Sequence, residues 1–281
     1  MSSAKKFISK FSDIEPLPHV VTKLSKLIAD SNSTIREFEA VIKMDPILVV
    51  RILRLVNSPF YGLVQKVDSI SRAVAYIGMK NLHNLAITDA MKTMFTDTKQ
   101  STAFSRKQIW LHSAAVSICC KMVAERIFGI NGDNAYLSGI LHDFGLIVEE
   151  QVKHEEFITL CQNPLTTAEL VENERRLFGT DHCEIGYHMC LEWAMPAVIQ
   201  EAIRDHHALL DDVMPNSLTG ILQISEYLVN QLGHPTLPNS VNTISPQLLA
   251  HISDNQEEYA VLLEDFPEEM AKAQDIYSVE A

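Results

Sequence analysis

The stretch DPILVVRILRLVNSPFYG (residues 45–62) contains a helix start signal, an apolar helix body and a stop signal. Asp45 suits the N-cap position, and Pro46 suits the first helical position, where its missing N–H is not needed. The body has no glycine, and the Ser-Pro pair after Asn57 disfavours further helix because proline restricts the residue before it. We therefore predict a helix over about 45–57, followed by a loop over 60–69.

The same signals recur along the chain and predict an all-α protein. Thr34 with Glu37, and Asp181 with Glu184, match the capping-box pattern. Glycine and proline are sparse (10 and 11), and no period-2 strand pattern of convincing length occurs. The segment 233–246, GHPTLPNSVNTISP, is predicted to be a loop. The predicted helices cover about 34–44, 45–57, 70–78, 81–95, 105–128, 134–150, 155–162, 166–178, 181–193, 196–207 and 217–232, with two weaker helices after them.

The predicted helices fall into two lobes. Around residues 96–104 the sequence becomes small and polar, TDTKQSTAF, which marks a subdomain boundary. We expect an N-terminal helical lobe over residues 1–98 and a helical bundle over residues 99–281. Acidic residues gather near the C-terminus, where they predict solvated helices.

Composition narrows the class of protein. The formal net charge is −13 and no basic run is present, so we expect no nucleic-acid partner. The most apolar run, PILVVRILRLV, is too short to span a bilayer and contains two arginines, and the N-terminus lacks a signal-peptide core. Five cysteines without a C-x-x-C pair indicate reduced core thiols. Together these features predict a cytoplasmic protein without membrane contact.

Several histidines and acids lie inside predicted helices, where ionisable groups need a partner. In a helical bundle, such residues from different helices can converge on one metal site. Imidazole and carboxylate donors together suit iron or manganese before zinc, as one or two ions. A bound metal lowers the pKa of a water ligand and so supplies a nucleophile near neutral pH. The candidate metal ligands are His112, His142, Asp143, His182, His206, His207 and Glu226.

The remaining histidines have a simpler interpretation. A lone histidine in a helix is more often a structural residue than a ligand, and no local spacing of the zinc-finger kind occurs. We therefore assign no site to His19, His83, His154, His188, His234 and His251.

The ordered set of histidines and acids resembles the HD superfamily of metal-dependent phosphohydrolases, and the chain as a whole resembles an HDOD domain. The resemblance covers about residues 10–232 and is most specific in the pair LRLVNSPFYG and SISRAVAYIG. It implies that His112, His142, Asp143 and Glu226 hold a first metal. It also implies that His182, His206 and His207 hold a second metal, with Asp143 bridging the two.

Four departures from the catalytic pattern point away from turnover. The late acid is Glu226, where the enzymes usually have Asp. Leu146 in HDFGL replaces the lysine of the HD-GYP cyclic-di-GMP phosphodiesterases, and Ala208 replaces the glutamate of their HHE motif. The Gly-Tyr-Pro signature is also missing, so that activity is not expected.

The N-terminal lobe carries a second group of polar residues. Arg51, Arg54 and Asn57 recur at a spacing of three along one helix, and Arg72 lies beside the segment SIS. The structural interpretation has Asn57 capping the turn and the arginines pairing with acids such as Asp45. The alternative is a surface for a ligand or partner.

Two functional hypotheses remain. The first is a stand-alone bacterial signal-transduction module that binds a signalling protein or a small phosphorylated ligand, with a retained metal site and no turnover. The second is a metal-dependent phosphohydrolase acting on a nucleotide or another small phosphate ester, with His142 and Asp143 as catalytic residues. The sequence leaves the oligomeric state open.

Overall fold

The protein is almost entirely helical in the computed structural model, which describes residues 2–14, 19–95, 103–162, 165–210, 212–238 and 240–277. Within these ranges the β pairing is limited to one isolated bridge between Thr166 and Val241. The prediction of an all-α fold is confirmed. The expected subdomain boundary at residues 98 and 99 lies outside the described residues.

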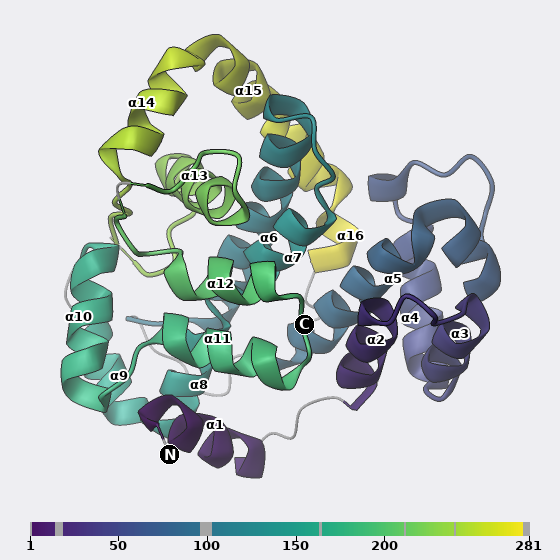
Figure 1. The fold of residues 1–281 in the computed structure, drawn as a ribbon, viewed down its shortest axis with the longest axis horizontal. Helices are drawn as coiled ribbons and strands as arrows, with labels where there is room; N and C mark the ends of the chain where they lie inside the picture. The colour runs from purple at the N-terminus through teal and green to yellow at the C-terminus, as the bar shows by residue number, and fades with distance from the viewer. Residues whose placement is uncertain are drawn as a thin grey trace.

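The N-terminal helices form a group on one side of the molecule (Figure 1). α5 is the centre of this group, because the other helices of the group pack against it. α1 (Ser3–Ile14) is different, since it packs against α8 and α11 of the later part of the chain. The helices of the group are α2 (His19–Ala29), α3 (Ile35–Lys43), α4 (Pro46–Val56) and α5 (Ile70–Met94), with a 3-10 turn η1 (Pro59–Tyr61).

Helix boundaries in this group follow the predicted signals. The Thr34–Glu37 capping box is present in both directions. The Asp45 carboxylate accepts hydrogen bonds from the N–H groups of Ile47 and Leu48. Gly78 interrupts α5 with a φ of 79°, a conformation that glycine adopts without steric cost, so the predicted end at this residue is a kink between two helical segments.

The later helices form a larger bundle around α6 and α7 (Figure 1). Their bounds are α6 (Arg106–Met122), α7 (Asp133–Leu141), α8 (Phe144–Val152), α9 (His154–Cys161), α10 (Thr167–Phe178), α11 (His182–Glu192), α12 (Ala197–Asp205), α13 (Leu218–Gln231), α14 (Pro246–Asp254), α15 (Gln256–Lys272) and α16 (Gln274–Tyr277).

Two predicted helices of the bundle are not continuous. The helix predicted over 134–150 is divided between α7 and α8, because Asp143 (φ −96°, ψ 7°) leaves the helical conformation. The helix predicted over 105–128 ends in a π-helical turn, η2 (Val123–Ile127), in which the Phe128 N–H donates to the Val123 carbonyl. Gly129, with a φ of 63°, ends this segment as predicted.

Other details also differ from prediction. Asp181 accepts from the Glu184 N–H, but the Glu184 carboxylate accepts from the Thr180 hydroxyl, so no reciprocal capping box forms. Between residues 246 and 277, where the structure describes the chain, three helices rather than two are present. Among them α15 is amphipathic: Tyr259, Leu262 and Phe266 are buried, and its acids face outward.

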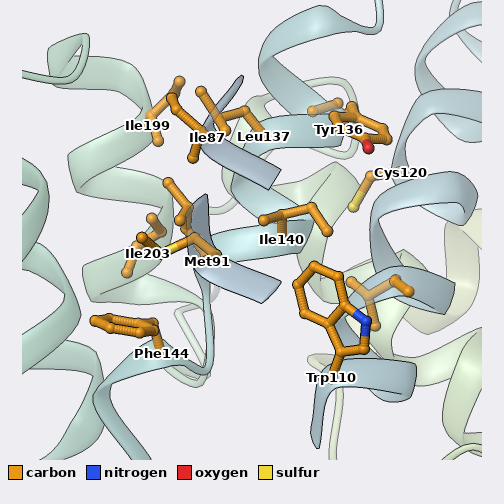
Figure 2. Packing of buried hydrophobic residues seen from close by; sticks show 14 of the residues in the cluster. Ile87, Met91, Trp110, Cys120, Tyr136, Leu137, Ile140, Phe144, Ile199 and Ile203 are labelled. Atoms are coloured by element: carbon orange, nitrogen blue, oxygen red, sulfur yellow. The ribbon is translucent and has the colours of Figure 1, made fainter. Parts of the chain in front are cut away.

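One hydrophobic core joins the N-terminal helices to the bundle (Figure 2). Ile87 and Met91 of α5 lie between α7 and α12, near Leu137, Ile199 and Ile203. All five cysteines are buried and unpaired, which confirms the expectation of reduced core thiols. Among the helices of the described ranges, none combines the length and apolarity needed to cross a bilayer.

His83 makes the stability of this shared region depend on pH. Its Nε2 atom lies 3.0 Å from the Ser25 hydroxyl of α2, and burial lowers the pKa of His83 to about 4. Below pH 6.5 the unfolded chain therefore binds a proton at this ring that the folded protein does not bind until about pH 4. Folding stability falls as the pH is lowered between these two values.

We predict that wild-type protein loses about 2 kcal/mol more stability than His83→Gln between pH 7 and pH 4.5. Glutamine can still donate to Ser25 but does not titrate. Urea unfolding of both proteins at the two pH values measures the difference. Equal losses would show that His83 is not held in its neutral form.

Candidate metal centre

The seven candidate metal ligands converge in the bundle from five separate places in the chain. Six are buried and His207 is partly buried. They lie on α6, in the turn between α7 and α8, at the start of α11, directly after α12, and on α13: His112, His142 with Asp143, His182, His206 with His207, and Glu226.

The donor atoms form two groups on either side of Asp143. One group is His112, His142 and Glu226, and the other is Asp143, His182, His206 and His207; within each group the donor atoms lie within 4.8 Å of one another. Asp143 Oδ2 lies 3.2 Å from His142 Nε2 and 3.6 Å from His112 Nε2. Asp143 Oδ1 lies 3.6 Å from His206 Nε2 and 3.7 Å from His182 Nε2. Each carboxylate oxygen therefore faces one group.

The break between α7 and α8 produces this arrangement. It turns Asp143 out of the helix so that its carboxylate enters the space between α6 and α11. Gly145, two residues later, packs directly on the backbone at the start of α11, where an added Cβ would lie 2.1 Å from the His182 carbonyl oxygen. This close approach brings His182 to the same point as Asp143.

The imidazole rings are oriented by hydrogen bonds at their Nδ1 atoms. Because a carbonyl or carboxylate oxygen can only accept, each of these Nδ1 atoms carries the proton, and Nε2 is left to face Asp143. Such outer contacts set the tautomer of metal-binding histidines. The pairs are His142 with the Gly139 carbonyl (2.9 Å), His206 with the Ile203 carbonyl (2.6 Å), His112 with the His234 carbonyl (2.6 Å) and His182 with Glu174 Oε2 (2.7 Å).

Seven of the inner donor atoms lack hydrogen-bond partners, although buried polar atoms nearly always have one. The atoms without a partner are both carboxylate oxygens of Asp143, both of Glu226, His142 Nε2, His206 Nε2 and His207 Nδ1. Unsatisfied nitrogen and oxygen donors aimed at a common point are the arrangement that a divalent transition metal completes. The residues present therefore fit such an ion.

Burial and mutual charge shift the pKa values of the centre in opposite directions. Burial alone would raise the pKa of Asp143, but the electrostatic influence of the neighbouring His142 and His112 holds it well below its usual range. Burial lowers the pKa of His112 to about 4 and raises that of Glu226 to about 7. Burial and the neighbouring His206 hold the pKa of His207 well below its usual range. Asp143, His112 and His207 are thus already in the deprotonated form that binds metal.

The sequence did not identify four residues around the centre. Glu174 accepts hydrogen bonds from the backbone N–H and Nδ1 of His182. Glu149 is buried beside Glu174. Burial is the larger cause that raises the pKa of Glu149, and the negative charge of Glu174 is the second. Cys183 Sγ lies 3.5 Å from His182 Nε2, and the Thr236 hydroxyl lies 2.9 Å from His112 Nε2. No motif marks these residues: Glu149, Glu174 and Thr236 reach the centre only through the fold, whereas Cys183 is next to His182 in the sequence.

A small cavity adjoins the centre, with Asp143 and His207 in its lining. Its volume of about 10 Å³ has room for about one water molecule. Opposite these ligands, the wall is formed by Leu165–Thr167 and by Thr236, Leu237 and Pro238. Leu146, which occupies the lysine position of the cyclic-di-GMP phosphodiesterases, is fully buried in the apolar core.

The second group of predicted residues lies on α4, α5 and the loop between them and makes structural contacts. Asn57 donates to the Leu53 and Val67 carbonyls and accepts from the Val67 N–H, so it closes the loop after α4. Arg51 pairs with an acid, as the structural interpretation expects, but this acid is Asp89, at 3.3 Å, while Asp45 caps α4. Arg72 pairs with Asp68 at 3.2 Å. A ligand or partner surface formed by Arg51, Arg54, Asn57 and Arg72 stays a prediction.

The sequence model of the HDOD domain matches residues 14–209 of the chain. A curated protein from Treponema pallidum (strain Nichols), described as uncharacterized, is 26% identical over 220 residues. The match covers 73% of this chain, which spans only 40% of that relative's length.

Solved structures show the same fold. An HDOD domain protein of unknown function from Geobacter sulfurreducens has a TM-score of 0.75 and 24% identity, with 99% of this chain and 98% of that chain covered. A proposed phosphohydrolase from Shewanella amazonensis SB2B has a TM-score of 0.65 and 22% identity, covering 98% and 96%. A proposed signal transduction protein from Marinobacter aquaeolei VT8 has a TM-score of 0.65 and 22% identity, covering 94% and 60%.

We predict that Gly145→Ala destabilises the protein by about 2–4 kcal/mol, because the new methyl group collides with the backbone of His182. Gly186→Ala on α11 is the matched control, since its Cβ would lie 2.9 Å from the Ile203 side chain and at an ordinary contact distance of 3.7 Å from the His142 carbonyl oxygen. Both changes add one methyl group to a helix, so the larger loss expected at Gly145 reports mainly on the α8–α11 backbone contact. Chemical unfolding tests it, and equal effects would contradict this account.

Proposed function

The chain belongs to the HDOD domain family, and from this premise we propose that it is a signal-transduction module with a buried metal centre and no turnover. It would bind a signalling protein or a small phosphorylated ligand and pass on a signal through that contact. The name of the Marinobacter aquaeolei protein, which shares the fold, agrees with a role of this kind.

The metal part of the proposal rests on the donor set. The first group would hold one ion through His112, His142 and Glu226, and the second group would hold another through His182, His206 and His207. Asp143 lies between the groups and can serve both with one oxygen each. Mixed nitrogen and oxygen donors suit iron and manganese as well as zinc, and we propose iron or manganese for this centre.

The small size of the cavity beside the centre is the observation that supports the proposed lack of turnover. A phosphate ester has to place its phosphorus atom beside the metal ions, and the cavity of about 10 Å³ has room for little more than one water molecule. The residues that close it belong to the start of α10 and to the loop after α13. The buried Leu146 adds no positive charge for a phosphate group.

A phosphohydrolase is the second candidate, and one observation favours it. Two donor groups that share a carboxylate can hold two ions close together, and such pairs clamp phosphate groups in hydrolytic enzymes. The name of the Shewanella amazonensis protein agrees with this alternative. Here a bound metal would supply the activated water, and movement of the cavity wall would have to admit the substrate.

We expect the purified protein to bind up to two Mn²⁺ or Fe²⁺ ions per chain, and Asp143→Asn to weaken binding at both positions by at least about tenfold. Asp205→Asn is the matched control, because this acid pairs with Arg204 on the surface. Elemental analysis and calorimetry under anaerobic conditions provide the measurement. No bound metal after loading with either ion would refute the metal centre.

We also expect the metal-loaded protein to hydrolyse p-nitrophenyl phosphate and its bis ester no faster than the His142→Ala variant. Both esters are too large for the closed cavity. Absorbance of released nitrophenol measures the rate. A rate typical of enzymes that disappears in His142→Ala would favour the phosphohydrolase instead.

A further inference from the structure

The loop after α13 places a short segment, His234–Pro238, directly over the metal centre. Thr236 and Leu237 are buried, whereas His234 is exposed to solvent. The segment is attached to α6 at two points one helical turn apart: Gln108 donates to the Pro235 carbonyl (3.2 Å), and His112 donates to the His234 carbonyl (2.6 Å). It thus has one face toward the ligands and one toward solvent.

This segment engages both nitrogen atoms of His112. The Nδ1 atom must donate to the His234 carbonyl, because that oxygen has no proton to give. In the resulting tautomer Nε2 is an acceptor, and the Thr236 hydroxyl, 2.9 Å away, donates to it. The lone pair of Nε2 is therefore occupied by the Thr236 proton.

A metal ion needs the same lone pair. Histidine binds metals as neutral imidazole through an unprotonated nitrogen, and Nε2 is the only such atom on His112 in this arrangement. One lone pair cannot accept a hydrogen bond from Thr236 and bind an ion together. His142 and Glu226, the other members of the first group, have inner donor atoms without hydrogen-bond partners.

We propose that Thr236 sets the metal affinity of the first site, because its hydroxyl competes with the ion for His112 Nε2. This inference rests on the proposed function, in which the centre binds metal. Ion binding breaks the Thr236 hydrogen bond and loosens the segment His234–Pro238. The exposed face of that segment then differs between the metal-loaded and the metal-free protein, which gives a signalling partner a surface that reports occupancy.

The test compares Mn²⁺ affinity in wild-type protein, Thr236→Val, Thr236→Ser and Thr243→Val. Valine keeps the shape of threonine and removes the hydroxyl, so we expect about fivefold tighter binding at one position, the equivalent of one hydrogen bond. Serine retains the donor and should bind as wild type does. Thr243→Val is the matched control, because the hydroxyl of Thr243 pairs with Thr167 and not with a candidate ligand.

Titration calorimetry gives the affinities, and thermal unfolding confirms that each variant folds. Unchanged or weaker binding in Thr236→Val would overturn the proposal, and weaker binding would identify the hydroxyl as a supporting group or a ligand. If wild-type protein binds no Mn²⁺, the proposed function fails first. If it binds Mn²⁺ and the variants are equal, only the role of Thr236 fails.

Hydrogen exchange provides a second readout that does not depend on the variants. We expect the amides of His234, Thr236 and Leu237 to exchange faster when Mn²⁺ is added to wild-type protein, and the amides within α13 to be unchanged. In Thr236→Val the metal-free segment should already exchange at the faster rate. Slower exchange in the metal-loaded wild type would contradict competition between the ion and Thr236.

Discussion

The burial of the Asp143 carboxylate among histidines is the interaction on which the rest of the structure depends. A carboxylate without charged or hydrogen-bonding partners is costly in a protein interior. Here Oδ2 faces His142 and His112, and Oδ1 faces His206 and His182. To supply these rings, α6, α11 and the end of α12 must meet the turn between α7 and α8 at one point. This requirement places these helices next to one another around Asp143.

Hydrogen bonds at the outer ring nitrogens fix the orientation of the histidines in the centre. Backbone carbonyls hold the Nδ1 atoms of His112, His142 and His206, and Glu174 holds that of His182. Each ring is therefore fixed in the tautomer that presents Nε2 inward. The same contacts connect the centre to distant parts of the chain, because the carbonyl that holds His112 belongs to the loop after α13. Under the proposed function, a change at the candidate ligands would reach the surface through the segment that contacts His112.

The N-terminal helices and the bundle are joined by shared packing. Ile87 and Met91 of α5 pack against α7 and α12, so the N-terminal helices and the bundle share one core (Figure 2). α1 packs on α8, which begins directly after Asp143, and on α11, which begins at His182. A rearrangement of the centre would therefore shift helices on both sides of the molecule, since packed cores transmit strain.

The sequence alone determined the helical class, many helix boundaries, the HDOD resemblance and the set of seven candidate ligands. Capping at Thr34 and Asp45 and the φ of Gly129 follow from contacts a few residues apart, so local chemistry predicts them. Only the tertiary structure decided the break between α7 and α8 at Asp143 and the pairing of Arg51 with Asp89. The hydrogen bonds between Glu174 and His182 and between Thr236 and His112 were also decided there. These depend on groups brought together from distant or separately folded segments, as with His112 and Thr236, which lie 124 positions apart. No local pattern records such a contact, because it exists only after the helices have packed.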